Sequence, residues 1–225
     1  MSDIAYRIIR RPRRKTAAIV IRADSSVEVL APSRISVSLI DHFVKSKQQW
    51  IQKKLSEREN RPAHQAKSFL TGEQFHLLGE AYSLQLRNGK RSVQVENNTL
   101  LVSHSNPQPE NTARQLSRWY RAQAETHFTD RCNTLAGLIG KKPQSVGVKA
   151  YKSRWGSCHI DGRVYFNWRL IMAPARVIDY VVVHELCHLI HHNHSKAYWQ
   201  LVESVMPDFK DAKLWLKSHG HTLEL

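Results

Sequence analysis

The amino-acid sequence predicts an α+β fold built in two portions, on the strength of three observations. Short runs rich in β-branched residues, separated by turn signals, occupy much of residues 1–109 and are typical of antiparallel strands. Apolar residues recur at three- to four-residue spacing in the longer segments, which indicates amphipathic helices. One helix within residues 110–225 carries histidines at metal-binding spacing, after two further strand-like runs. We therefore expect an antiparallel, strand-rich N-terminal portion with one amphipathic helix, followed by a metal-binding catalytic portion whose histidine-bearing helix packs on a small mixed sheet.

The composition limits the class of protein. The chain has 225 residues, of which 41% are hydrophobic and 24% charged, so it is long enough to bury a core and is typical of globular proteins. No apolar run approaches the roughly 20 residues that span a bilayer, and the first residues lack the apolar core of a signal peptide. Three widely spaced cysteines do not indicate a disulfide framework. These features predict a cytoplasmic protein with no membrane partner.

The N-terminal portion is predicted to begin with a hairpin and a helix. Residues 17–22 and 26–31 read as strands, and Asp24 with Ser25 suits the turn between them. Apolar residues then recur at helical spacing, which predicts one amphipathic helix over about residues 37–58.

A meander of three antiparallel strands is predicted next. Apolar and polar residues alternate over 82–86 and 93–95, and an apolar run follows at 100–102. The Asn88-Gly89 pair between the first two runs is a strong hairpin signal. We therefore expect the three strands to be neighbours in chain order.

The C-terminal portion is predicted to combine helices with two strands. A long helix is expected over residues 110–138, and strands over 146–150 and 163–166. Pro174 suits the first position of a helix that runs to about residue 190. A further helix is expected over residues 195–205.

The helix that starts at Pro174 contains the pattern His184-Glu-Leu-Cys-His188. Two imidazoles four residues apart lie on one helix face, about 6 Å apart along the axis, so both can bind one zinc ion. Glu185 lies one residue further round, within reach of a water molecule at the metal without being a ligand. A solvated histidine cluster is the alternative, but this helix is strongly apolar, and buried polar groups need partners. The pattern predicts one zinc ion per chain, with Glu185 as the catalytic base.

The third zinc ligand is open among four residues. His194 is favoured, but only if the helix ends before it, and Asn193 can adopt the left-handed conformation that ends helices. Glu203 on the next helix is the second candidate, because some enzymes with this motif take a glutamate there. His191 would lie about 10.5 Å along the axis from the first histidine of the motif, which is far for one ion. His192 is the fourth candidate for the third zinc ligand.

A segment before the metal-binding helix supplies the candidate substrate contacts. Arg154 and Ser157 have polar groups suited to binding substrate, whereas Trp155 and Cys158 are expected to pack the sheet against the helix. Further residues near the motif are expected to belong to the core rather than to the chemistry: Cys187, Tyr180, Tyr198 and Trp199.

Four blocks of sequence, in order within residues 145–219, resemble the YgjP-like metallopeptidase family, which is related to the SprT-like zinc metalloproteases. The blocks are Arg154–Cys158, Tyr165–Leu170, Asp179–Leu189 and Asn193–Ser195. The resemblance implies a zincin-like fold for the C-terminal portion. It also implies zinc bound by His184, His188 and His194, with Glu185 as the catalytic base.

The positive charge is concentrated in the first two thirds of the chain. With 34 Lys and Arg against 19 Asp and Glu, the net charge is +15. Residues 151–225 hold nine basic and seven acidic residues, which leaves +13 for residues 1–150. Arg7, Arg10, Arg11, Arg13, Arg14 and Lys15 form a dense run. The run is either a solvated surface or a site for a phosphate-rich partner, such as nucleic acid or a nucleotide.

Together these features predict a zinc-dependent hydrolase, most simply a metallopeptidase in which Glu185 activates a zinc-bound water against a peptide or protein substrate. The first alternative is a metal-dependent nucleotide pyrophosphatase, whose basic portion would receive the phosphates. The second is a nucleic-acid-binding module with a structural metal. An open coordination position would favour an enzyme, and four protein ligands would favour the structural site.

Overall fold

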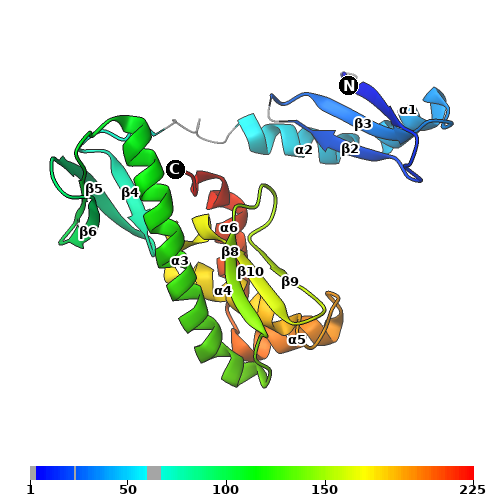
Figure 1. Ribbon diagram of the computed structural model, residues 1–225. Helices are drawn as coiled ribbons and strands as arrows, with labels where there is room; N and C mark the ends of the chain where they lie inside the picture. Colours follow the sequence, from blue (N-terminus) through cyan, green and yellow to red (C-terminus); the bar gives the residue numbers. More distant parts are fainter. Residues whose placement is uncertain (1–3, 23, 60–66) are drawn as a thin grey trace. The chain divides into compact units, whose positions relative to one another are not determined.

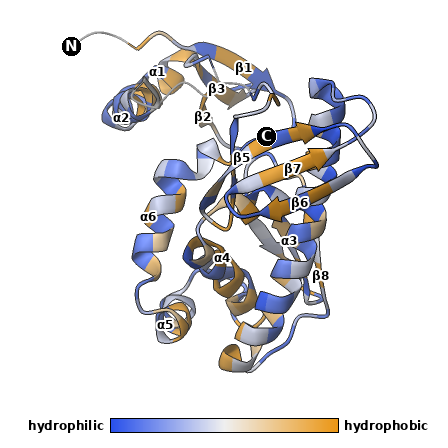
Figure 2. Cartoon of the chain, turned by 90° about the vertical axis from the view of Figure 1, so that its left-hand side faces the viewer, coloured by the Kyte–Doolittle hydropathy of each residue, from blue (hydrophilic) through white to orange (hydrophobic). Residues whose placement is uncertain are grey.

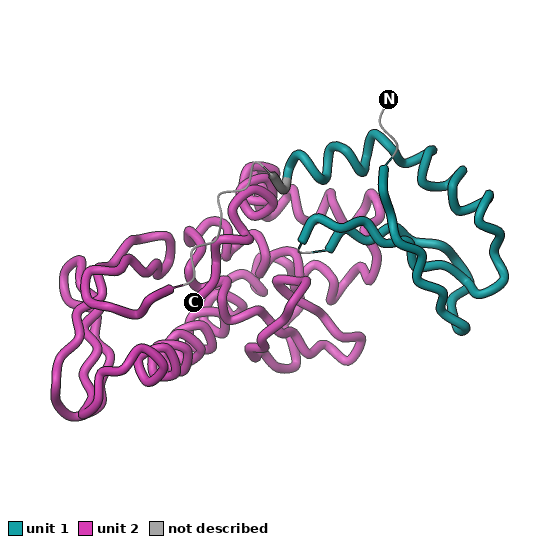
Figure 3. The backbone as a smooth tube through the Cα atoms, turned by 90° about the horizontal axis from the view of Figure 1, so that it is seen from above, with its two compact units in different colours: residues 1–64 teal, residues 65–225 magenta. Residues whose placement is uncertain are grey.

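The structure of the protein is a computed structural model that describes residues 4–22, 24–59 and 67–225 (Figure 1). The chain forms two compact units, residues 1–64 and residues 65–225 (Figure 3). Within the described residues, no helix is long and apolar enough to cross a bilayer.

Unit 1 contains a three-stranded mixed sheet. Its strands are β1 (Arg7–Arg11), β2 (Ala18–Ile21) and β3 (Val27–Pro32), in the order β1-β3-β2. The predicted hairpin of β2 and β3 is confirmed, because the two strands pair antiparallel. The expectation of a purely antiparallel portion is wrong, because β1 pairs with β3 in parallel. In the sequence, β1 is recognised only as part of a basic run, because three of its five residues are arginines.

Two helices cover one face of this sheet. The single helix expected over residues 37–58 is interrupted at Lys47, giving α1 (Val37–Ser46) and α2 (Gln48–Glu59). Ser36 caps α1 by accepting a hydrogen bond from the backbone N–H of Leu39. Alternate residues of β3 and apolar residues of both helices form the core of unit 1: Val27, Val29, Ala31, Ile40, Val44 and Ile51.

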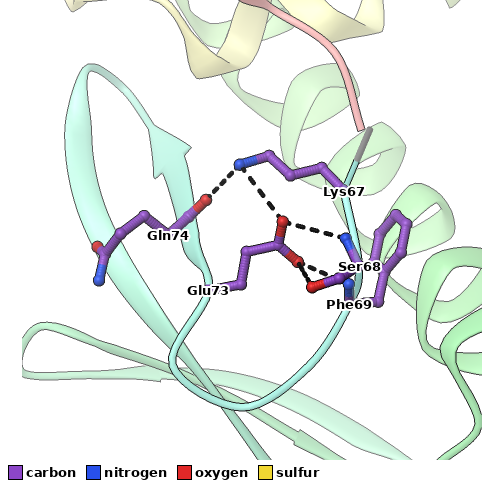
Figure 4. Close-up of polar contacts among 5 residues, drawn as sticks. All are labelled: Lys67, Ser68, Phe69, Glu73 and Gln74. Atoms are coloured by element: carbon purple, nitrogen blue, oxygen red, sulfur yellow. Dashed lines mark hydrogen bonds and ion pairs between the residues drawn. The ribbon is translucent and has the colours of Figure 1, made fainter. Parts of the chain in front are cut away.

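A turn stabilised by polar contacts, residues 67–74, leads the chain into the first strand of unit 2 (Figure 4). The Glu73 carboxylate accepts hydrogen bonds from the backbone N–H groups of Ser68 and Phe69, at 3.1 and 2.6 Å. Lys67 Nζ donates to the carbonyl of Gln74 at 2.7 Å. Phe69 has a φ of 56°, an unusual conformation for a residue with a side chain. The carboxylate satisfies the amides that this turn exposes.

The first sheet of unit 2 has four strands in the order β4-β5-β7-β6. They are β4 (Gln74–Leu77), β5 (Glu80–Arg87), β6 (Ser92–Glu96) and β7 (Thr99–Ser103). The predicted meander is wrong, because β5 pairs with β7 in parallel and β6 lies at the edge. Burial explains the order: β7 is almost wholly buried, whereas β6 is half polar and exposed, as suits an edge strand.

The second sheet of unit 2 is the small mixed sheet that the sequence predicts. It contains β8 (Ser145–Lys149), β9 (Gly156–Cys158) and β10 (Arg163–Asn167) in the order β8-β10-β9. The central strand β10 is parallel to β8 and antiparallel to β9. The long helix α3 (Pro109–Ile139) precedes this sheet and confirms the helix predicted over residues 110–138.

Helices complete unit 2. α4 (Ala175–Cys187) and α5 (Lys196–Val205) correspond to predicted helices, whereas α6 (Phe209–His219) was not predicted. Short 3-10 turns lie at η1 (Trp168–Met172) and η2 (Gly220–Thr222). Figure 2 shows that α4 is mostly hydrophobic, whereas α6 is largely hydrophilic. Buried on most sides, α4 is the central helix of unit 2.

The two sheets of unit 2 share one core, which explains why the compact unit begins near residue 65 rather than at the boundary expected near residue 109. Tyr120 on α3 donates its hydroxyl proton to the carbonyl of His76 at 2.8 Å. Gly79, with a φ of 88°, lies so close to Pro174 that a Cβ atom at Gly79 would be 2.8 Å from the proline Cα. The turn between β4 and β5 therefore contacts the start of α4 directly.

Candidate metal centre

The end of α4 presents two residues of the metal-binding motif. His184 and Glu185 lie in the last turn of the helix, and Glu185 is only 6% exposed. The helix ends at Cys187, with His188 as its C-cap, three residues before the predicted end at residue 190. This early end lets the chain turn back toward the histidines.

His194 returns to the motif because the chain turns between α4 and α5. Ser195 caps α5 by accepting a hydrogen bond from the backbone N–H of Tyr198. The side chain of Asn193 accepts a hydrogen bond from the backbone N–H of Ser195 at 3.2 Å. Asn193 does not use the left-handed conformation that is open to it, because its φ is not positive. The side chain of Asn193, rather than its backbone conformation, shapes the turn.

Three imidazole nitrogens converge at this point. The Nε2 atom of His194 lies 3.1 Å from that of His188 and 3.2 Å from that of His184. Zinc binds histidine nitrogen at about 2.0–2.1 Å in tetrahedral geometry, which separates two ligand nitrogens by roughly 3.4 Å. The three nitrogens therefore fit the ligand spacing of a single ion.

The other candidate ligands do not join the three histidines. His191 contributes only its backbone carbonyl, which lies 2.9 Å from Nδ1 of His188. His192 lies outside the group of residues that could hold a metal ion, among the residues that the structure describes. Glu203 lies 3.5 Å from the ammonium of Lys210, on the exposed side of α5. Of the four candidates, His194 is the one whose ring nitrogen lies within the described group of His184 and His188.

Burial of His184 and His188 favours the neutral form of their imidazoles, which is the form that binds a metal. Burial, with the nearby His188 and His194, lowers the pKa of His184 to about 3. Burial also lowers the pKa of His188. When Nδ1 of His188 donates to the carbonyl of His191, the lone pair of His188 is left on Nε2, facing the other rings.

Two aromatic residues of α5 support the histidine rings. Tyr198 stacks on His188 with ring centroids 4.6 Å apart, and Trp199 stacks on His194 at 5.6 Å. The buried hydroxyl of Tyr198 donates to the carbonyl of His184 at 3.0 Å. Tyr180 stacks on Phe209 and also meets the ring of His184 edge-on, with ring centroids 5.9 Å apart. These contacts are those of packing residues, which is the role expected for Tyr180, Tyr198 and Trp199.

Glu185 is buried against the backbone of β9. A Cβ atom at Gly156 would lie 2.4 Å from Oε1 of Glu185, so only glycine leaves room for the carboxylate. Burial raises the pKa of Glu185 to about 8, and the charge of Arg154 and the backbone N–H of Cys158 oppose this rise. The motif glutamate is thus held in a fixed, poorly solvated position.

An open depression of about 500 Å³ joins the residues singled out from the sequence. Its lining includes the three histidines and Glu185, together with Arg154 and Ser157. The hydroxyl of Ser157 lies 2.7 Å from that of Tyr151, and the Arg154 guanidinium lies 5.7 Å from the Tyr151 ring centroid. Sequence reasoning missed Tyr151, although it lies only three residues before the Arg154 block.

The cysteines and Trp155 have mainly structural positions. Cys187 is fully buried, and Trp155 packs beside Gly220, where a Cβ atom would lie 3.1 Å from the indole ring. Cys158 is half-buried, contacts the core and also lines the depression, which goes beyond the packing role expected for it. All three cysteines of the chain, Cys132 included, are free.

Similarity to known proteins shows both the class and the family to which this chain belongs. The sequence profile of the YgjP-like metallopeptidase domain matches residues 15–219, which is most of the chain. With three histidines and a glutamate at one depression, the chain is thus one of the metallopeptidases, a class of metal-dependent hydrolases. Within that class it belongs to the YgjP-like family, so the resemblance seen in the sequence is confirmed.

Other comparisons add little. No match is found among curated proteins. Among solved structures, the metallopeptidase zymogen of Pyrococcus abyssi abylysin matches with 20% identity and a TM-score of 0.37, over 40% of this chain and 93% of that one. At this level the likeness adds nothing to the description of the fold or the site.

Proposed function

We propose that the protein is a zinc peptidase of the zincin type, in which His184, His188 and His194 bind one zinc ion and Glu185 is the general base. The observation that carries this proposal is the convergence of three Nε2 atoms, with separations of 3.1 and 3.2 Å, at a depression that Glu185 also lines. Three protein ligands leave a tetrahedral position open, which favours a catalytic site over a structural one.

The chemistry assigns separate tasks to metal and chain. A bound zinc ion supplies a Lewis acid, which polarises a carbonyl group and acidifies a water molecule. Glu185 accepts the proton of the attacking water and delivers it to the leaving amine. Its raised pKa applies to the metal-free chain, and the carboxylate form is favoured once a cation lies nearby. The apolar surroundings of α4 keep the Glu185 carboxylate fixed during this transfer.

The strand β9 supports a peptide as the substrate. In the described sheet β9 has a neighbour on one side only, and Gly156, Ser157 and Cys158 all line the depression. An extended peptide can pair with such an edge through main-chain hydrogen bonds. Arg154 would then contact a negative or carbonyl group of the substrate, and the Ser157 hydroxyl would assist it.

A nucleotide pyrophosphatase is the second candidate, because of Arg154. This arginine is exposed at the depression and makes no ion pair within the described residues, so it is free to bind phosphate.

The three free cysteines support a reducing compartment, such as the cytoplasm, for either activity.

One screen separates the two candidates. The zinc-loaded protein is tested on a mixed peptide library and on nucleoside triphosphates, with Glu185→Gln as the blank. We expect peptide cleavage that the variant loses although it keeps its zinc. Release of pyrophosphate by the wild type alone would select the second candidate. Equal turnover by both proteins would exclude Glu185 as the base.

A further inference from the structure

One edge of the sheet in unit 1 gathers two loops. Because β1 and β3 are parallel, both end at this edge, where Arg11 pairs with Pro32. The antiparallel strand β2 begins at the same edge, where Ala18 pairs with Leu30. The loop from β1 to β2 and the segment from β3 to α1 therefore leave the sheet side by side.

These two loops carry cations and no carboxylates. Residues 10–17 and 32–40 contain no Asp or Glu, whereas residues 1–64 as a whole hold 14 Lys and Arg against 6 Asp and Glu, a net charge of +8. Six basic residues lie at the end of β1 and in these loops, and form what we call the basic edge: Arg10, Arg11, Arg13, Arg14, Lys15 and Arg34. The topology of the sheet thus brings Arg34 to a cluster that is contiguous in sequence only from Arg10 to Lys15.

Two members of the basic edge brace the loops. Arg10 donates to the backbone carbonyls of Ser33 and Ile35, both at 2.8 Å, and so ties the end of β1 to the segment before α1. Arg14 donates to the carbonyl of Thr16 at 3.1 Å. These bonds use carbonyl groups as acceptors, so they fix the loops without neutralising their charge.

The other four cations face solvent. Arg11, Arg13, Lys15 and Arg34 are exposed, and none makes an ion pair or side-chain hydrogen bond in the part of the chain that the structure describes. Unpaired cations in a cluster repel one another. A polyanion with regularly spaced negative charges neutralises them, and the counterions condensed on the polyanion are released on binding. Five of the six residues are arginines, whose planar fork binds two phosphate oxygens at once.

We propose that the basic edge binds the phosphodiester backbone of nucleic acid. Contacts from these side chains to phosphate oxygens carry no sequence information, so we expect binding that is independent of sequence. This inference stands apart from the peptidase chemistry, because it concerns unit 1 and needs neither the histidines nor a metal.

The test compares two variants of the full chain that lose the same charge. The edge variant replaces Arg11, Arg13, Lys15 and Arg34 by Gln, leaving the bracing residues Arg10 and Arg14 in place. The control variant replaces Lys45, Lys47, Lys53 and Lys54 by Gln. These lysines lie at the end of α1 and in α2, at least about 12 Å along the helices from the basic edge.

Binding is measured by fluorescence anisotropy with single- and double-stranded DNA of about 20 nucleotides, in two unrelated sequences, over a salt titration. We expect the edge variant to bind at least about tenfold more weakly at 0.1 M salt. The slope of log K against log salt should become shallower by about 3 to 4, since each phosphate contact contributes about 1. The control variant should stay within about threefold of the wild type.

Several results would overturn the proposal. Equal losses in both variants would assign the binding to net charge rather than to the edge. Absence of DNA binding by the wild type would exclude the partner. Binding of a poly-glutamate peptide as tight as that of DNA would identify an acidic protein instead. Unchanged circular dichroism and melting temperature of the edge variant are expected, because the four replaced side chains have no partners in the described structure, and they exclude misfolding as the cause.

Discussion

Gly156 on β9 and Glu185 on α4 are fitted to one another. A Cβ atom at residue 156 would lie 2.4 Å from Oε1 of Glu185 and 2.5 Å from its Cγ, well inside the contact distance of non-bonded atoms. The glycine therefore determines how deep the carboxylate lies beside the histidines. This relationship joins the Arg154–Cys158 block of the sequence to the metal-binding motif, His184–His188, by physical contact.

Gly156→Ala should therefore displace the carboxylate without removing a metal ligand. We expect hydrolysis to fall by roughly 10²-fold, the cost of a misplacement of about 1 Å, with zinc content unchanged. Gly137→Ala is the matched control, because a Cβ atom at Gly137 in α3 meets nothing within 4 Å. Full activity in Gly156→Ala, or equal losses in the two variants, would contradict the role given to the contact.

Glu185→Gln should separate chemistry from metal binding. Glutamine keeps the shape of glutamate but cannot accept the proton, so turnover should fall by roughly 10²–10⁴-fold. Glu185 lies outside the group of three converging nitrogens, so the zinc content per chain should stay that of the wild type. Turnover and elemental analysis on the same preparation check both halves. A variant that loses its zinc would mean that Glu185 is a ligand.

The buried carboxyl of Glu185 should make the metal-free protein sensitive to pH. Its pKa is about 8 in the folded chain, against the ordinary value of 4.5 in the unfolded chain. Between these values the folded state holds a proton that the unfolded state has released, so stability falls as the pH rises from about 4.5 to 8.

Glu185→Gln removes this dependence. Without metal, the variant should exceed the wild type by on the order of 5 kcal/mol in free energy of unfolding at pH 9, and the difference should vanish near pH 4. Urea unfolding after treatment with a chelator measures it. A difference that does not change with pH would show that the carboxyl keeps its ordinary pKa.

Gly79→Ala should weaken the junction between the four-stranded sheet and α4. The new Cβ atom would meet Pro174 at 2.8 Å, in backbone with a φ of 88°. We expect a loss of about 2–4 kcal/mol in the free energy of unfolding, from strain and overpacking together. Gly72→Ala is the control, because Gly72 has a φ of 94° and no neighbour within 4 Å, so it reports the backbone strain alone. Equal losses in the two would mean that the contact with Pro174 adds nothing.

Local periodicity predicts the parts of this protein that depend on local contacts. His184 and His188 share a helix face because they lie four residues apart, and α3 and α4 appear where apolar spacing predicts them. The position of His194 depends on where α4 ends, which spacing alone does not determine. The contact between Gly156 and Glu185 joins residues 29 positions apart, and a single sequence carries no signal for it.

The order of the strands in the sheets also depends on contacts between residues far apart in the chain. The Asn88-Gly89 pair predicts a hairpin from local turn chemistry, yet β5 gains more by pairing with the buried strand β7. In unit 1 the sequence pattern does not indicate β1 as a strand, because only two half-buried isoleucines lie between its arginines. In both sheets the pairing of the strands follows burial in the folded structure rather than the local sequence pattern.

The claim that His184, His188 and His194 form one metal site is tested most directly by elemental analysis of protein prepared without a histidine tag. We predict one zinc ion per chain in the wild type and in Glu203→Ala, and a large loss of zinc in His194→Ala, because one of three protein ligands is gone. A wild type that neither contains nor takes up a transition metal would contradict the account, as would a zinc-replete His194→Ala beside a metal-free Glu203→Ala.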